Sequence, residues 1–430
     1  MKPIPFGILT DSCDSASGLG RIGRDIASRL YKSNLPIKVA TLGFAGQGTQ
    51  SCSWLQYNLG PFHNPSDLVR LIPSWMDFTN GEPGILLTIY DLPRLEAFRF
   101  PELYGRPWTD FLKGNEIHLW GYFPVDSHTP GRGFTRQTAE VLRSFDRILG
   151  YGPYGESVLR TAFQKLDGPK AIEPEDITWL SHGIDLKVFS DKGKRGRAKL
   201  TREVSTEIIS SEGHVATRRI QVEEGDRLLG VVATNQPRKD WGAVFDIFSR
   251  LGTNWKLWCH TDKIVNSWSL PDLAEQFGVS DRFFVTLSLD DSELADLYSA
   301  CDVTLAPGLG EGFGYPIVES LGCGTPVVHL DFAGGADLLP RAMRIVPITT
   351  RVEGPYCFQR PVWDTLEAAI RIDMLSKAPR EFSPLANPYD WNTLWPKWKT
   401  WLQEGISKVK TSQIRKDSPN TVKRRDIFQV

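Results

Sequence analysis

The sequence predicts an α/β protein with two domains, each built on a doubly wound parallel sheet. Its 430 residues, 41% hydrophobic and 23% charged, are enough for two domains with sizeable cores. Residues 6–41 have the pattern of a strand, an amphipathic helix and a second strand, which opens a doubly wound sheet. A second series of apolar segments starts at Leu228 and ends in a strand, glycine loop, helix and strand over 303–328.

The first series of strands is predicted at 6–10, 37–41, 84–90, 117–123 and 147–151. The loop after the first strand ends in Ser17-Gly18-Leu19-Gly20, where Gly18 and Gly20 would let the backbone come close to a ligand. This spacing is not the G-x-G-x-x-G fingerprint of a dinucleotide site, so no nicotinamide site is predicted. An ordinary tight turn is the alternative.

Polar residues follow predicted strands at the edge where such sheets bind ligands. Asp126 comes after the strand at 117–123 and could orient a hydroxyl group. Arg238 and Lys239 come after the strand at 228–233. A guanidinium next to an ammonium can clamp a diphosphate, since one gives paired hydrogen bonds and the other a point charge. A solvated basic dipeptide is the alternative reading.

The glycine loop at 308–314 carries Glu311 and leads into a predicted helix that carries Glu319. A glycine loop before a helix N-terminus presents free N–H groups and the positive end of a dipole, which favours a phosphate. Carboxylates beside that site suit hydroxyl groups rather than phosphate, because like charges repel. The pattern therefore favours a sugar nucleotide, with exposed surface carboxylates as the alternative.

This stretch resembles the E-x7-E motif of the retaining GT-B glycosyltransferases of family four, in the glycosyl transferases group 1. By that resemblance Glu311 contacts hydroxyls of the donor sugar and Glu319 contacts the ribose. The backbone amides around Gly312, Phe313 and Gly314 would face the sugar and the diphosphate.

The resemblance also implies roles elsewhere in the chain. Arg238 and Lys239 match the donor-phosphate motif, and the loop with Gly18 and Gly20 would approach the diphosphate across the cleft. Glu311, Arg238, Lys239 and Asp126 form the predicted catalytic set.

The GT-B fold implied here has two Rossmann-like domains facing across a cleft. We expect an acceptor domain at 1–183, a nucleotide-sugar domain at 184–387, a helix at about 388–410 that crosses back to the first domain, and a basic, mobile tail at 411–430. The segment at 177–185 resembles the family's linker, with His182 where asparagine is usual. Four tryptophans at 391–401 share one helical face and are expected to pack.

No Asp-x-Asp metal motif occurs in the chain, so we expect metal-independent transfer with no added cofactor. The donor would be a nucleoside diphosphate sugar, with UDP- and GDP-sugars favoured, and the resemblance implies a retained anomeric configuration. Six scattered cysteines without a C-x-x-C pair, and no signal peptide or spanning apolar run, favour the reducing cytoplasm.

The acceptor stays open. A soluble glycan or small molecule is favoured, and the oligomeric state is not predicted. A hydroxymethylated base in DNA, as for some phage enzymes, is an alternative that the basic segments at 187–202 and 408–425 could serve, although the net charge of −1 argues against it. A sugar-nucleotide epimerase or a non-catalytic binding protein of the same architecture is the alternative from another class.

Overall fold

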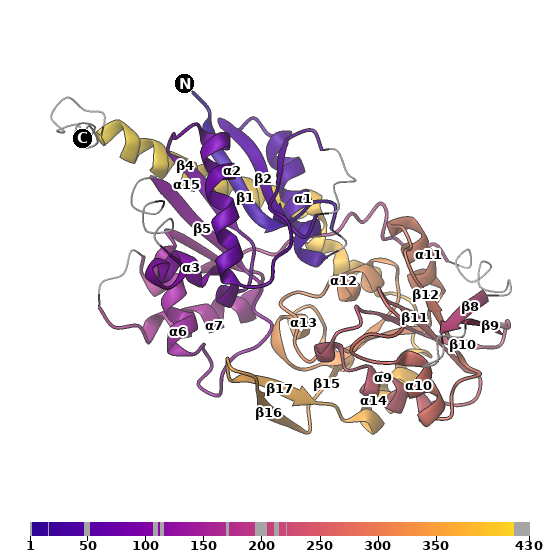
Figure 1. Cartoon of the computed structure of the whole chain (residues 1–430). Coiled ribbons are helices and arrows are strands. Elements are labelled where there is room, and N and C mark those ends of the chain that lie inside the picture. The colour runs from indigo at the N-terminus through magenta and orange to yellow at the C-terminus, as the bar shows by residue number, and fades with distance from the viewer. Residues whose placement is uncertain are drawn as a thin grey trace.

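The computed structural model describes residues 2–15, 17–46, 52–105, 111, 116–168, 172–193, 204–209, 215–220 and 222–416. Within these residues the chain forms two domains, each with one parallel sheet, as predicted (Figure 1). The basic tail predicted as mobile at 411–430 begins inside the last helix, which continues to Lys416, so the prediction is wrong for 411–416. Residues 417–430, and the middle of the basic segment at 194–203, lie outside the described residues.

The first sheet has the order β3-β2-β1-β4-β5-β6-β7, and every pairing in it is parallel. Its strands are β1 (Ile4–Asp11), β2 (Ile37–Phe44), β3 (Leu55–Asn58), β4 (Gly84–Thr88), β5 (Ile117–Phe123), β6 (Arg147–Gly150) and β7 (Thr178–Trp179). The five predicted apolar segments form β1, β2, β4, β5 and β6, with β5 at the predicted bounds, whereas the edge strand β3 was not predicted.

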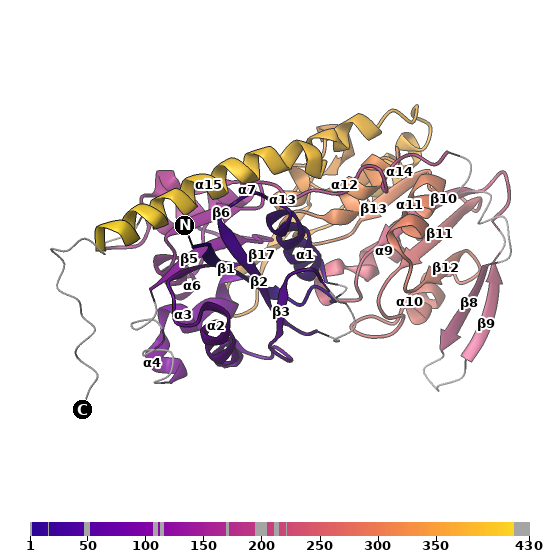
Figure 2. The ribbon, with the colours of Figure 1, turned by 90° about the horizontal axis from the view of Figure 1, so that it is seen from above.

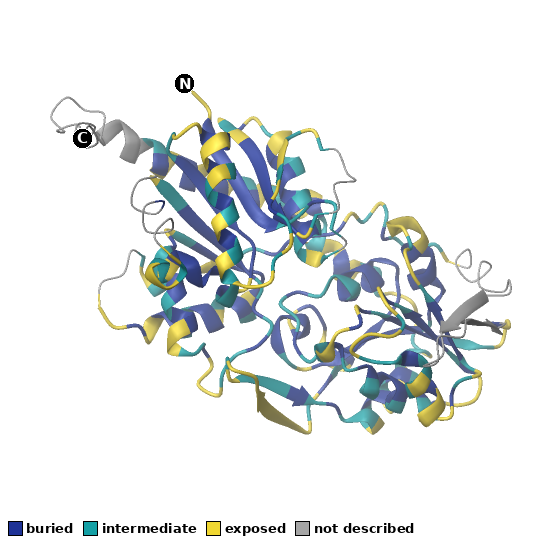
Figure 3. Ribbon diagram, viewed as in Figure 1, coloured by how far each residue is buried: buried dark blue, intermediate teal, exposed yellow. Residues whose placement is uncertain are grey.

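Helices cover both faces of this sheet, which is why its strands are nearly continuous apolar runs (Figure 3). The helix α1 begins after the Ser17 N-cap and buries Ile22, Ile26 and Leu30, the predicted stripe. The helices are α1 (Gly18–Tyr31), α2 (Leu71–Thr79), α3 (Glu96–Arg99), α4 (Pro101–Tyr104), α6 (Arg136–Glu140) and α7 (Pro153–Gln164), with 3-10 turns η1 (Pro65–Arg70), η2 (Leu92–Leu95), η3 (Val141–Ser144) and η4 (Pro174–Asp176).

The second sheet has the order β12-β11-β10-β13-β14-β15 and is also parallel throughout. Its strands are β10 (Arg227–Val232), β11 (Trp255–His260), β12 (Phe283–Thr286), β13 (Val303–Ala306), β14 (Val327–Leu330) and β15 (Arg344–Ile345). The surrounding helices are α9 (Trp241–Ser249), α10 (Leu270–Gln276), α11 (Asp291–Ala300), α12 (Tyr315–Gly322), α13 (Ala333–Ala336) and α14 (Thr365–Leu375), with 3-10 turns η5 (Pro237–Lys239), η6 (Arg341–Met343) and η7 (Ser383–Tyr389).

Two antiparallel hairpins extend from the second domain. Apolar and polar residues alternate over 203–222, which predicts a hairpin-like insertion. The strands β8 (Val204–Ile209) and β9 (Val215–Ile220) form that hairpin at the end of the molecule farthest from the first domain (Figure 2). The pair β16 (Thr349–Glu353) and β17 (Phe358–Val362) was not predicted. All five residues of β16 are exposed, so this strand has no buried face and needs no alternation of apolar and polar residues.

The last helix, α15 (Trp391–Lys416), leaves the second domain and runs along the first (Figure 2). Its tryptophans pack as expected: the Trp391 indole donates to Asp25 on α1, and Trp398 donates to the Ser181 carbonyl oxygen. Trp401 packs edge-on against Trp120 of β5 at 5.1 Å between ring centroids. These contacts hold the helix against the first domain, while the chain enters it from η7 (Ser383–Tyr389) of the second.

Candidate functional site

The second domain reverses its strand order at β10, which has β11 on one side and β13 on the other. Ligands of doubly wound sheets bind at such a switch point, beyond the carboxyl ends of the strands. The two segments that follow β10 and β13 are the turn with Arg238 and Lys239 and the glycine loop with Glu311. The Leu309 amide donates to the Arg238 carbonyl oxygen at 2.8 Å, which holds the two segments together.

Glu311 lies between both cations. Arg238 Nη1 lies 3.3 Å from Glu311 Oε2 and 3.1 Å from the Gly310 carbonyl oxygen, and Lys239 Nζ donates to Glu311 Oε1. The Lys239 and Glu311 side chains are 10% and 13% exposed. Three of the four residues of the predicted catalytic set, Glu311, Arg238 and Lys239, therefore meet, although both carboxylate oxygens of Glu311 face cations rather than open space.

The charge balance of this cluster favours an anion. Burial raises the pKa of Glu311, but Lys239 and Arg238 outweigh burial and hold the pKa at about 2. Burial and the neighbouring Arg238 lower the pKa of Lys239, while Glu311 opposes them. Two cations face one carboxylate, so the cluster keeps one positive charge in a largely buried place when all three are ionised.

Glu319 is not a free acceptor in this structure. It is 2% exposed on α12, where Arg21 Nη1 lies 2.5 Å from one carboxylate oxygen and the Tyr298 hydroxyl donates to the other at 3.0 Å. Arg21 comes from α1 of the first domain, and its guanidinium also lies over the Tyr315 ring at 4.5 Å. Sequence reasoning missed Arg21, since a single arginine on an amphipathic helix gives no signal of a partner 298 residues away.

The two glycines of the first loop have different surroundings. Gly18 is exposed, and a Cβ atom built on it would lie 3.9 Å from Tyr315 across the cleft. Gly20 is buried, and a Cβ atom there would lie 2.5 Å from the Ser12 carbonyl oxygen. Ser17 caps the helix by accepting from the Gly20 amide at 3.0 Å. Gly18 therefore faces the second domain, whereas Gly20 packs the helix against its own loop.

Asp126 lies where the two domains touch. Its carboxylate is 3.7 Å from Arg360 Nη2 on β17, and a Cβ atom on Gly310 would lie 2.0 Å from its carbonyl oxygen. A Cβ atom on Gly312 would lie 3.2 Å from Pro124 Cα. The glycine loop thus packs directly against the first domain, a role that the sequence did not predict for these glycines.

Phe313 and Gly314 complete the loop. The Phe313 ring is buried, with its centroid 4.0 Å from that of His182, so this side chain packs at the domain junction. Gly314 is the N-cap of α12 with a φ of 103°, a left-handed conformation that favours glycine. Pro316 falls in the first turn of α12, where its missing N–H group leaves no helical hydrogen bond unmade.

Among the described residues, no helix is both long and apolar enough to cross a bilayer. In the same residues, no group of three or more histidine, cysteine, aspartate or glutamate side chains is arranged to hold a metal ion.

Comparison with known proteins adds a matching domain model, two relatives and a fold. Residues 219–339 match the model of the glycosyl transferases group 1 family. The chain is 28% identical over 268 residues to a D-inositol 3-phosphate glycosyltransferase of Nocardiopsis dassonvillei, covering 57% of this chain and 59% of that protein. It is 25% identical over 211 residues to an MMP alpha-(1->4)-mannosyltransferase of Mycolicibacterium hassiacum, covering 49% of this chain and 42% of that protein. The matches thus span about half the length of these relatives.

Solved structures share the whole architecture. The Anabaena protein HepE, in complex with UDP and glucose, has a TM-score of 0.63 at 14% identity and covers 93% of this chain and 100% of its own. A sucrose-phosphate synthase from Thermosynechococcus elongatus has a TM-score of 0.65 at 14% identity, covering 94% of this chain and 100% of its own. The fold is therefore GT-B, with two Rossmann-like domains, as predicted.

Proposed function

We propose that this chain, which carries a glycosyl transferases group 1 domain in a GT-B fold, transfers a hexose from a nucleoside diphosphate sugar to a hydroxyl group of a soluble glycan or small molecule. The transfer retains the anomeric configuration and needs no bound metal ion, and the donor is a UDP- or GDP-sugar. The two relatives, a D-inositol 3-phosphate glycosyltransferase and an MMP alpha-(1->4)-mannosyltransferase, are enzymes of this reaction class.

One observation carries the proposal: Arg238 and Lys239 converge on Glu311 at the switch point of the second sheet. Breaking the bond between the anomeric carbon and the diphosphate develops negative charge on the leaving group. Fixed cations aimed at developing charge are commonly the largest catalytic contribution, worth about 3–4 kcal/mol for one donor. Arg238 and Lys239 would provide this stabilisation without a metal ion.

Glu311 holds the two cations in place before the donor arrives. When the diphosphate binds, its oxygens would share Arg238 and Lys239 with Glu311, which frees carboxylate lone pairs for hydroxyls of the donor sugar. In the same way, a ribose hydroxyl would share Glu319 with Arg21. Glu311 orients the sugar in this scheme and does not attack it.

Retention follows from the family resemblance. The acceptor hydroxyl attacks the anomeric carbon from the face that the diphosphate leaves, and the departing phosphate oxygen takes the hydroxyl proton. The new glycosidic bond forms as the bond to the diphosphate breaks, so no side chain needs to form a covalent intermediate.

The proposal is tested by donor hydrolysis with UDP-glucose, UDP-galactose, GDP-mannose and GDP-glucose, each in the presence of EDTA. We expect one of these to be hydrolysed slowly, and Glu311→Ala to lower that rate at least 100-fold. Glu275→Ala, which removes an exposed carboxylate from α10, is the matched control and should keep the rate. The proposal fails if none of the four is hydrolysed, or if Glu311→Ala behaves like Glu275→Ala.

A further inference from the structure

A cavity of about 320 Å³ lies beside the proposed transfer site, where the first domain meets the β16–β17 hairpin of the second. The first domain contributes the segments that follow β4 and β5, and the hairpin contributes the third wall. Its wall includes four charged side chains, Asp91, Arg94, Asp126 and Arg360, and the aromatic rings of Phe134 and Phe358.

The hairpin is fastened to the first domain by two hydrogen bonds to the backbone of Gln359. The Gln359 amide donates to the His128 carbonyl oxygen at 2.9 Å, and the Ser127 hydroxyl donates to the Gln359 carbonyl oxygen at 2.6 Å. Figure 1 shows the hairpin reaching from the second domain toward the first. These contacts place its inner residues in the cavity wall, so that the cavity is built by both domains.

The hairpin also touches the glycine loop of the transfer site. A Cβ atom on Gly310 would lie 2.9 Å from Arg360 Nη1, and Trp363, just after β17, donates from its indole to the Pro307 carbonyl oxygen at 3.4 Å. A molecule in the cavity would therefore lie next to the loop that carries Glu311.

The polar side chains of the cavity can hydrogen-bond to the hydroxyl groups of a ligand, and their two carboxylates and two guanidinium groups have no net charge when all are ionised. Asp91 and Asp126 offer carboxylate oxygens that accept from hydroxyls, and Arg94 and Arg360 offer guanidinium groups that donate to them. Arg360 Nη1 is buried and finds no hydrogen-bond partner among the described residues. A buried donor of this kind favours a ligand that accepts from it.

Aromatic rings form the rest of the wall. Phe358 lies 6.2 Å from Phe134 of the first domain and 5.8 Å from Tyr356 between ring centroids. Small-molecule sites commonly combine such apolar walls with a few converging polar groups, in volumes of about 300–1,000 Å³. A cavity near the lower limit of that range fits one sugar ring better than an extended chain.

We propose that the β16–β17 hairpin is a sugar-recognition element, which closes this cavity around one neutral sugar ring, with Phe358 as an apolar wall and Arg360 as a hydrogen-bond donor to the ring oxygens. The identification of this sugar as the acceptor rests on the proposed transferase function. The binding of a sugar ring in the cavity does not depend on that function. The donor-side domain would then help to select the acceptor.

Saturation-transfer NMR on the full chain tests the inference, with methyl α-glucoside as the neutral probe and glucose 6-phosphate as the charged one. We expect transfer to methyl α-glucoside, and at least a five-fold loss of that signal in Arg360→Ala and in Phe358→Ala. Arg351→Ala is the charge-matched control, since Arg351 pairs with Arg360 across the hairpin but is exposed. Phe358→Leu keeps most of the side-chain volume, and a melting curve on each variant identifies any loss of folding.

Three results would overturn the inference. The first is an equal signal in Arg360→Ala and Arg351→Ala, and the second is an unchanged signal in both folded Phe358 variants. The third is binding of glucose 6-phosphate at the hairpin in preference to the neutral probe. Donor hydrolysis without a hairpin-dependent sugar signal would contradict this inference alone. A hairpin-dependent signal without hydrolysis of any donor would contradict the proposed function alone.

Discussion

Arg21 Nη1 lies 2.5 Å from Glu319 Oε1, and this ion pair joins the first helix of one domain to a helix of the other. The Glu319 side chain is 3% exposed and the Arg21 side chain 19%. Burial raises the pKa of Glu319, and Arg21 and the Tyr298 hydroxyl oppose this by stabilising the carboxylate. Arg21 of the first domain therefore holds Glu319, the residue proposed to bind the ribose, so a change in the distance between the domains would also affect Glu319.

Arg21→Ala should destabilise the protein by about 3 kcal/mol, because removing one partner of a buried pair leaves an uncompensated charge. The measurement is urea unfolding at pH 7. Lys32→Ala, an exposed cation at the end of the same helix, should change stability by less than about 0.5 kcal/mol. Arg21→Ala/Glu319→Gln should be more stable than Arg21→Ala alone. If the double variant is the less stable one, the pair is not coupled as described.

The sequence contained most of the fold. Apolar runs such as 117–123 and the stripe of Ile22, Ile26 and Leu30 gave strands and helices close to those observed, since local pattern decides which residues a sheet can bury. The convergence of Arg238 and Lys239 on Glu311 was predictable for a related reason. Each follows a strand, and β10 and β13 are neighbours in the sheet.

Contacts between the domains were not predictable in this way. The pairing of Arg21 with Glu319 and the close packing of Gly310 against Asp126 depend on how two separate sheets are placed. The β16–β17 hairpin was missed because its exposed strand lacks alternation, and Pro361 lies within its partner strand.

Gly18 and Gly20 should respond differently to alanine. Gly20→Ala places a Cβ atom 2.5 Å from the Ser12 carbonyl oxygen, so the helix or its loop must shift at a cost of about 1–3 kcal/mol. Gly18→Ala meets nothing closer than Tyr315 at 3.9 Å and should change stability by less than about 0.5 kcal/mol. Thermal unfolding of the two variants measures this difference, and equal melting temperatures would show that the first turn is not packed as described.

Asp91 should give stability a pH dependence between pH 4 and 6. Restricted hydration within the cleft, with the nearby Asp126 carboxylate, raises its pKa to about 6. A raised pKa means that the folded state favours the protonated acid. The stabilising contribution is therefore present below the unfolded pKa of about 4 and is lost as the pH rises through about 6.

Asp91→Asn should therefore gain stability relative to the unmodified protein on going from pH 4 to pH 7.5. The full pKa shift of Asp91 would correspond to about 3 kcal/mol in the free energy of unfolding. Because Asp91 is exposed, screening by solvent reduces the expected gain in that free energy to about 1 kcal/mol. Urea unfolding at the two pH values measures it. Asp281→Asn, at an exposed turn, is the control and should show no such gain. A loss of stability in Asp91→Asn over the same pH range would contradict the raised pKa of Asp91.

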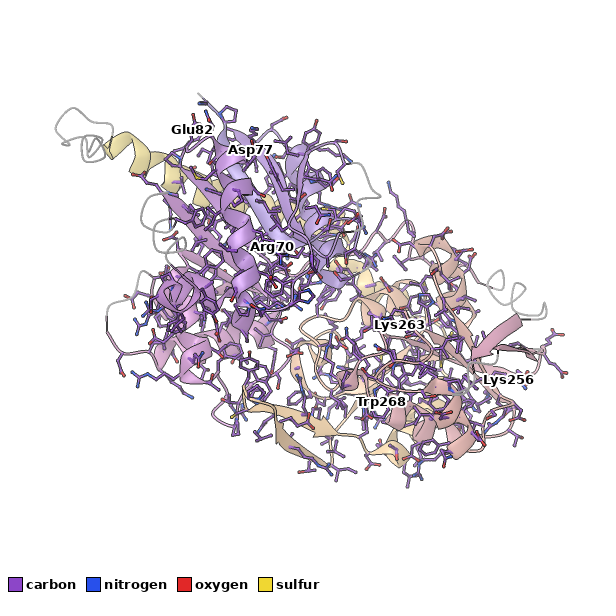
Figure 4. The ribbon with its side chains drawn as sticks, viewed as in Figure 1. Arg70, Asp77, Glu82, Lys256, Lys263 and Trp268 are labelled. Atoms are coloured by element: carbon purple, nitrogen blue, oxygen red, sulfur yellow. The ribbon has the colours of Figure 1, made fainter. Side chains whose placement is uncertain are left out.

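The most direct test of the central claim is calorimetric titration of UDP and of GDP into the protein with EDTA present. We predict that one of them binds, and that Lys239→Ala raises its Kd by about 10- to 100-fold, or about 1.4–2.7 kcal/mol. Lys256→Ala removes a cation near the amino end of β11, on the side of the second domain away from the first (Figure 4), and should change the Kd less than two-fold. Binding that EDTA abolishes, or an equal Kd in the two lysine variants, would contradict the account.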